Sequence, residues 1–317
     1  MAVPSSIQRL EPLPAIAVDL LDRIASHTIE DANLLGFLQA QPDLLAESLH
    51  VAMQAFGPAA DETPEPQSLL KQMSSRKIAE ISMTVLVGSY LRRAISNSDD
   101  QRYWRYILAC AVCCEQIALP RQEDILLAYT AGLFHDIGRM ALIAAYPDRY
   151  SNLLTLTDRM FATAEPFDIL EHERLLFGLD HFETAIWIAG AWKLPSWLRA
   201  IVGKFDQRAN SDHAQLVATV RAGTSLAHSL GFGYLTAAPR GDIRKILGRF
   251  EHADKHWKVL DSWEYAEENM RGKVRSCLRC YAADQQLTTE EKPMSPHLRV
   301  WPQPPNTLQH GKIDADK

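Results

Sequence analysis

A histidine and an aspartate lie side by side in an otherwise apolar stretch, TAGLFHDIGRMAL, at residues 130–142. A buried charge without a partner is costly, so His135 and Asp136 need something that satisfies them. One purpose is chemical, because histidine and carboxylate ligands can hold a divalent ion that activates water to hydrolyse a phosphate ester. The other purpose is structural. In that case Arg139, which is within one helical turn, pairs with them in a metal-free polar core.

The elements that must position this pair are helical. Apolar residues recur at three- and four-residue intervals along most of the chain, and no strand-like alternation competes with them. The run DILLAYTAGLFHDIGRMALIAA at residues 124–145 predicts one helix that carries both residues, whose side chains then point about 100° apart. Both can therefore approach one ion only if neighbouring helices complete its coordination.

The predicted fold class is all-α, a two-lobed helical bundle. The first lobe is expected over residues 1–95, and the lobe that carries the His-Asp pair over residues 96–235. Further helices are expected over residues 236–284. Residues 285–317 are polar and rich in proline, which is typical of a disordered tail.

Composition excludes several classes of protein. The formal net charge of -6 over 317 residues argues against a nucleic-acid binder, which needs an excess of Lys and Arg. No segment offers the ~20 apolar residues of a membrane span, and the N-terminus lacks a signal-peptide pattern, so we expect a cytoplasmic protein without membrane partners. The five cysteines fit no disulfide framework and are expected to be buried or half-exposed.

Several separated motifs occur in an order that resembles a known family. AGLFHDIGRMAL is followed by YPDRY and by HERLLFGLDHFETAIWIAGAWKLPSWLRAIV, and is preceded by LEPLPAIAVDLLDRI and QPDLLAESLHVAMQAFG. Over about residues 8–235 the chain is similar to the HDOD domains, the HD-related output domains of bacterial signalling proteins. The resemblance implies that the second lobe is HD-like and that the protein works in signal transduction.

The resemblance also implies which metal ligands of the HD superfamily are kept. His135, Asp136 and His181 match ligand positions. The other ligand positions hold residues that coordinate metals poorly, namely Tyr106, Lys204, Phe205 and Thr224. Asp206 lies nearby and is a possible substitute. Lys204 would repel a cation, or would join His181 in pairing with the His-Asp pair from facing helices. We use the name HD pocket for this set: Tyr106, His135, Asp136, Arg139, His181, Lys204, Asp206 and Thr224.

Two functions remain open from the sequence. The favoured one is a regulatory HDOD protein with no catalytic residues, metal or cofactor, which binds other signalling proteins and less plausibly a cyclic dinucleotide. The alternative is a metal-dependent phosphohydrolase or phosphodiesterase with an incomplete ligand set of His135, Asp136 and His181. Metal content discriminates between them.

Overall fold

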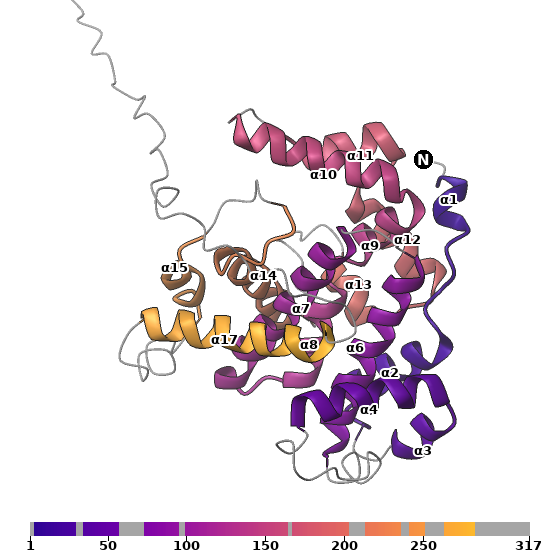
Figure 1. Ribbon diagram of the computed structural model, residues 1–317, viewed down its shortest axis with the longest axis vertical. Helices are drawn as coiled ribbons and strands as arrows, with labels where there is room; N and C mark the ends of the chain where they lie inside the picture. The colour runs from indigo at the N-terminus through magenta and orange to yellow at the C-terminus, as the bar shows by residue number, and fades with distance from the viewer. Residues whose placement is uncertain are drawn as a thin grey trace, which may run out of the picture. The chain divides into compact units, whose positions relative to one another are not determined.

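Helices make up the computed structural model, and no strand occurs in the residues that it describes (Figure 1). This confirms the predicted all-α class. The described residues are 3–29, 34–56, 73–94, 99–163, 167–202, 213–235, 241–250 and 263–282. None of the helices within these ranges is long and apolar enough to cross a membrane.

Three N-terminal helices pack against one long helix, α6 (Ser75–Ala94). α2 (Ala15–Ala25) buries residues spaced by three and four positions, from Ala17 to Ile24, and this places its apolar face on the core. α4 (Pro42–Phe56) has the most extensive contact with α6. The short helix α3 (Leu34–Gln39) is the third that packs against α6, whereas α1 (Ser5–Gln8) packs against α9 (Ile137–Ala145).

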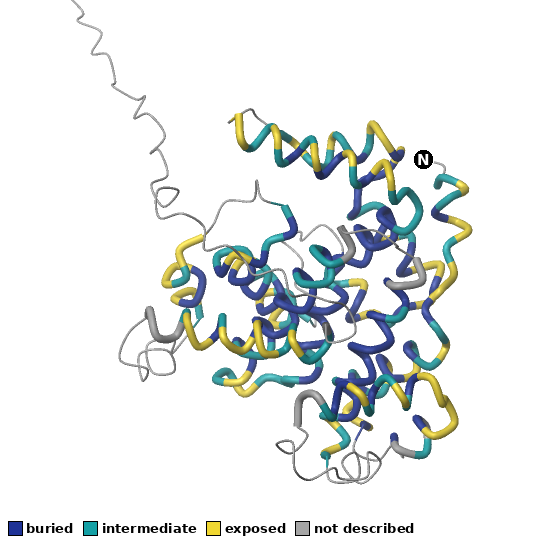
Figure 2. The backbone as a smooth tube through the Cα atoms, in the orientation of Figure 1, coloured by how far each residue is buried: buried dark blue, intermediate teal, exposed yellow. Residues whose placement is uncertain are grey.

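α8 (Ile125–Phe134) is the central helix of the second part and is buried along most of its length. Its sequence is apolar on every side, which is typical of a helix surrounded by others. α7 (Asp99–Ala118) packs so closely against it that a Cβ on Gly132 would lie 2.7 Å from the Cα of Ala111. α14 (Ala214–Ser229) packs against both helices, and Figure 2 shows this interior as buried backbone.

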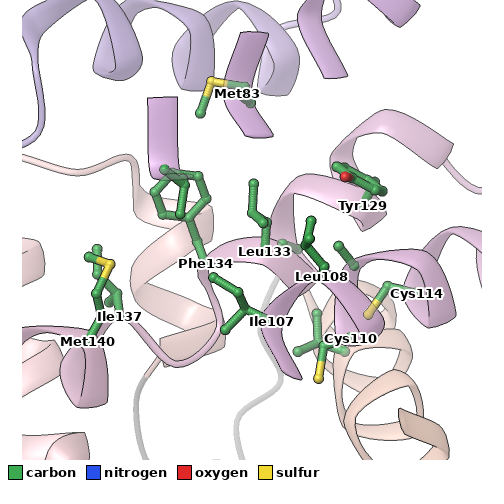
Figure 3. Packing of buried hydrophobic residues seen from close by; sticks show 14 of the residues in the cluster. Met83, Ile107, Leu108, Cys110, Cys114, Tyr129, Leu133, Phe134, Ile137 and Met140 are labelled. Atoms are coloured by element: carbon green, nitrogen blue, oxygen red, sulfur yellow. The ribbon is translucent and has the colours of Figure 1, made fainter. Parts of the chain in front are cut away.

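Buried cysteines are part of this core. Cys110, Cys113 and Cys114 lie in α7 and are fully or almost fully buried (Figure 3 labels Cys110 and Cys114 near Leu108). Cys277 and Cys280 are partly buried in α17 (Trp263–Ala282). All five thiols are free. The predicted packing role is confirmed.

The helices that follow α8 place the polar residues of interest. α9 (Ile137–Ala145) packs against α12 (His181–Ala191), with α10 (Pro147–Ala162) and α11 (Ile169–Phe177) between them in the chain. The start of α12 is fixed by a capping box. The Asp180 side chain accepts from the Glu183 N–H, and the Glu183 side chain accepts from the Asp180 N–H, both over 2.9 Å.

The remaining helices are η1 (Leu119–Arg121), α13 (Ser196–Val202) and α15 (Ile243–Leu247). α14 is followed by Gly231 with a φ of +91°, a left-handed conformation in which glycine often ends a helix. Residues Met1–Tyr281 form one compact unit. The predicted boundaries after residues 95 and 235 stay predictions, and the tail at 285–317 lies outside the described residues.

The prediction of one helix over residues 124–145 is wrong. The helix ends at Phe134 and a new helix begins at Ile137, so His135 and Asp136 form the junction of α8 and α9. Asp136 leaves helical geometry with a φ of −110° and a ψ of 29°, while the Tyr103 hydroxyl donates to its backbone carbonyl over 2.8 Å. The break gives α9 its own direction, toward α12.

Candidate functional site

Arg139 lies at the centre of a buried polar network that links α9 to α10, α11 and α12. Its Nε donates to Asp136 Oδ2 over 2.7 Å, and its Nη1 donates to the Tyr150 hydroxyl over 2.8 Å. Nη1 also lies 3.3 Å from Glu173 Oε1, and Nη2 lies 3.2 Å from His181 Nε2. The side chains of Arg139, Asp136 and Glu173 are only 8%, 7% and 0% exposed. Water therefore screens these interactions weakly.

Glu173 is the buried carboxylate that joins Tyr150 and His181 to the network. Its Oε1 accepts from the Tyr150 hydroxyl over 2.5 Å, and its Oε2 accepts from the backbone N–H and Nδ1 of His181 over 2.9 and 2.6 Å. Burial alone would raise the pKa of Glu173. The charge of Arg139 and the hydrogen bonds from His181 and Tyr150 instead lower this pKa from 4.5 to about 2. Glu173 is therefore ionised at any ordinary pH.

Arg139 stays charged as well. Burial alone would lower its pKa, but the neighbouring Asp136, Tyr150 and Glu173 raise it well above the ordinary value. His181 lies between the two charges. Its Nδ1 donates to Glu173, so Nε2 keeps its lone pair and can accept from Arg139 Nη2. In metal sites a carboxylate orients a histidine toward an ion in the same way. Here a guanidinium takes the place of that ion.

His135 is engaged at both ring nitrogens although it is only partly buried. Nδ1 lies 2.8 Å from the Gly132 carbonyl oxygen and therefore donates to it, which leaves Nε2 to accept from the Tyr106 hydroxyl over 2.9 Å. Burial lowers the pKa of His135, against the opposing charge of Asp136. The neutral ring is thus held in one tautomer, and its lone pair is directed at Tyr106 rather than at an ion.

The structure brings together five residues of the HD pocket: Tyr106, His135, Asp136, Arg139 and His181. Thr224 lies on α14, and its hydroxyl donates to the Arg221 carbonyl oxygen of its own helix over 2.9 Å. Lys204, Phe205 and Asp206 lie outside the described residues.

Sequence reasoning missed four residues that contact this group: Glu173, Tyr150, Tyr103 and Tyr234. Signals for two of them were present. Tyr150 is the tyrosine of YPDRY, and Glu173 lies four residues before the buried Phe177 on the inner face of its amphipathic helix. Tyr103 precedes Tyr106 by one helical turn. Tyr234 follows a glycine stop, and only the folded chain shows where its ring goes.

The residues present do not fit the divalent ion of the HD superfamily. His135 has no free lone pair, and both Asp136 and His181 face a guanidinium that would repel a cation. Within the part of the chain that the structure describes, no three His, Cys, Asp or Glu side chains are arranged to hold a metal ion. The chemistry of this site is therefore that of a satisfied polar core.

The His228→Gln variant is expected to be less sensitive to acid than the wild type. Burial, together with the nearby His135 ring and the charge of Arg139, lowers the pKa of His228 from 6.5 to about 4. The unfolded chain therefore binds the proton first, and stability that is complete above pH 6.5 is lost as the pH falls toward 4. Between pH 7 and pH 5 the wild type should lose about 2 kcal/mol more than the variant. Urea unfolding at both pH values measures the difference, and equal losses would contradict the assignment.

Comparison with known families gives one match. The model of the HDOD domain family matches residues 10–207, which is more than half of the chain. The matched range includes α2 to α13 and ends before α14 begins. None of the curated proteins compared with the chain is a significant match.

Three solved structures from bacteria have folds similar to that of this chain. An HDOD domain protein with unknown function from Geobacter sulfurreducens aligns with a TM-score of 0.67 at 18% identity, over 90% of this chain and 96% of that one. A protein from Shewanella amazonensis, described as a candidate phosphohydrolase, aligns with 0.58 at 18% identity, over 88% and 97%. A protein from Marinobacter aquaeolei, described as a candidate signal transduction protein, aligns with 0.59 at 17% identity, over 86% and 64%. At these identities the likeness shows a common fold alone.

Proposed function

This chain belongs to the HDOD domain family, and from that premise we propose that it is a regulatory module without catalytic activity that acts in signal transduction by binding other signalling proteins. The family is related to the HD superfamily of metal-dependent hydrolases. The question is therefore whether the HD pocket of this chain catalyses a reaction. One observation carries the proposal: the guanidinium of Arg139 lies against Asp136 and His181, where a catalytic HD domain would need an ion.

This arrangement argues against metal-assisted hydrolysis, which has two requirements. An ion must be held by ligands with free lone pairs, and a coordination position must stay open for water and substrate. Here His135 Nε2 accepts from Tyr106, while Asp136 Oδ2 and His181 Nε2 accept from Arg139. On this proposal the module activates no water, and its helical surface serves to bind other proteins.

The proposal predicts that the purified chain carries far less than one equivalent of Mn, Fe, Ni, Zn or Mg. It also predicts no hydrolysis of bis(p-nitrophenyl) phosphate, with or without added metal, because no water would be activated. Elemental analysis by mass spectrometry and an absorbance assay measure the two quantities. The matched variants are His135→Ala and, at an exposed position outside the site, His50→Ala.

About one tightly held ion per chain, lost from His135→Ala but kept by His50→Ala, would contradict the proposal. So would hydrolysis that disappears only in His135→Ala. The signalling part has its own test, which is cross-linking and capture from the native host with residues 285–317 present or removed. We expect a signalling protein to be recovered in a defined ratio to the bait, and recovery of none would contradict this part.

A further inference from the structure

The ring of Tyr234 is surrounded by side chains from three helices, α7, α9 and α10. It is near-parallel to the rings of Tyr106 and Tyr150, at interplanar angles of 25° and 23° and centroid distances of 6.2 and 6.5 Å. The ring of Tyr103 meets it edge-on at 5.3 Å. Such offset and edge-to-face arrangements are those that aromatic rings prefer. Tyr234 is only 1% exposed, so its ring is enclosed by residues of α7 and α10.

Two arginines also lie beside the ring of Tyr234. The guanidinium carbons of Arg102 and Arg139 each lie 5.7 Å from the centroid of the Tyr234 ring. Neither supplies spare positive charge. Arg102 donates to both carboxylate oxygens of Asp158 over 2.9 and 3.1 Å, and Arg139 is paired with Asp136 and Glu173. An additional anion would therefore face three carboxylates whose guanidinium partners are already engaged.

The segment that carries Tyr234 has no helical structure of its own. Residues 231–235 follow α14. Gly231 adopts a φ of +91°, and no atom lies within 4 Å of a Cβ built at this position. Gly233 packs against the ring of His228. Tyr234 also lies beyond residues 10–207, the range that the family model matches. The enclosing residues thus belong to the matched HDOD domain, while the ring that they enclose comes from the segment after it.

We infer that the HDOD domain contains a binding site for one uncharged phenolic ring, and that Tyr234 occupies this site as an internal ligand. The stacked and edge-on tyrosines recognise the ring, and the paired arginines present cation–π contacts without net positive charge. This goes beyond the proposed signalling role and does not depend on it. The site is defined by the residues that contact the ring: Tyr103, Tyr106, Tyr150, Arg102 and Arg139.

Removing the internal ligand tests the inference. Tyr234→Ala is expected to bind one p-cresol per chain, at least about ten-fold more tightly than the wild type, because a vacated, enclosed aromatic cavity takes up a ring of matching size. Titration calorimetry measures the affinity. If the variant is poorly folded, far-UV circular dichroism should show that p-cresol raises its melting temperature. The absence of both binding and a thermal shift would overturn the inference.

Three controls distinguish a specific site for a phenolic ring from a cavity that would bind any small aromatic molecule. Tyr234→Phe keeps the ring and should not bind p-cresol. Tyr129→Ala removes an equally buried tyrosine from α8, and equal binding there would overturn the claim of a specific site. The anion 4-hydroxybenzoate should bind Tyr234→Ala at least about ten-fold more weakly than p-cresol, since a buried carboxylate would lack a free cationic partner. Tighter binding of the anion would overturn the assignment of an uncharged ligand.

Discussion

Replacing Gly138 by alanine is expected to lower the free energy of unfolding by about 3 kcal/mol or more, the upper end of the cost of overfilling a packed core. A Cβ at this position would lie 1.8 Å from the carbonyl oxygen of His181 and 2.7 Å from the backbone nitrogen of Ala185. Both are backbone atoms of α12, so no side chain can rotate away to make room. α9 and α12 would have to separate, and the contact of His181 with Arg139 would be lost with them.

Gly190→Ala on α12 is the matched control. No atom lies within 4 Å of a Cβ built there, and the residue lies in the last turn of a helix. Alanine should leave stability unchanged or raise it by about 0.5–1 kcal/mol through its better helix propensity. Urea unfolding followed by circular dichroism compares the two variants. Equal effects at Gly138 and Gly190 would mean that α9 and α12 are not in the close contact described above.

Arg139→Met should be at least as damaging, with an expected loss of about 3–5 kcal/mol. The methionine fills part of the volume but leaves Asp136 and Glu173 as buried carboxylates without their cation. Arg149→Met, at an exposed position of α10, is the control and should change stability by less than about 0.5 kcal/mol. Chemical denaturation gives both values.

If Arg139→Met loses stability because two carboxylates become unpaired, rather than because packing is lost, neutralising these carboxylates should restore some of it. Adding Asp136→Asn and Glu173→Gln to Arg139→Met should recover part of the lost stability, because the unpaired charges are removed while the shapes are kept. If the triple variant is less stable than Arg139→Met alone, the loss comes from packing, and the network is not held by its charges.

Sequence periodicity predicted the helices well but not the break between them. The apolar repeat of α8 continues in α9, so nothing local marks His135 and Asp136 as a junction. The break depends on contacts from distant residues, namely the Tyr103 hydroxyl on the Asp136 carbonyl and the close approach of α12 at Gly138. Such tertiary contacts override a pattern that sequence alone reads as continuous.

The candidate site was predictable only where its partners are neighbours in the chain. The spacing of Asp136 and Arg139 is that of an i,i+3 pair, and the hydrogen bond between them follows from it. His181 could be placed through the resemblance. Glu173 and Tyr234 could not, because Glu173 reaches Arg139 across 34 residues and the Tyr234 ring meets Tyr106 from a segment with no regular structure. Their burial is decided by packing between helices.

α14 extends the compact fold of this chain beyond the range that the family model matches. The family match ends at residue 207, yet α14 packs along α7, and a Cβ on its Gly223 would lie 2.4 Å from the Cys114 sulfur. A fragment cut at the end of the match would expose the buried side of α7 to water and would lack the ring of Tyr234, which leaves its enclosure empty. The compact unit Met1–Tyr281 is thus longer than the range that the family model matches, and truncated versions of this protein should be designed to include α14 and Tyr234.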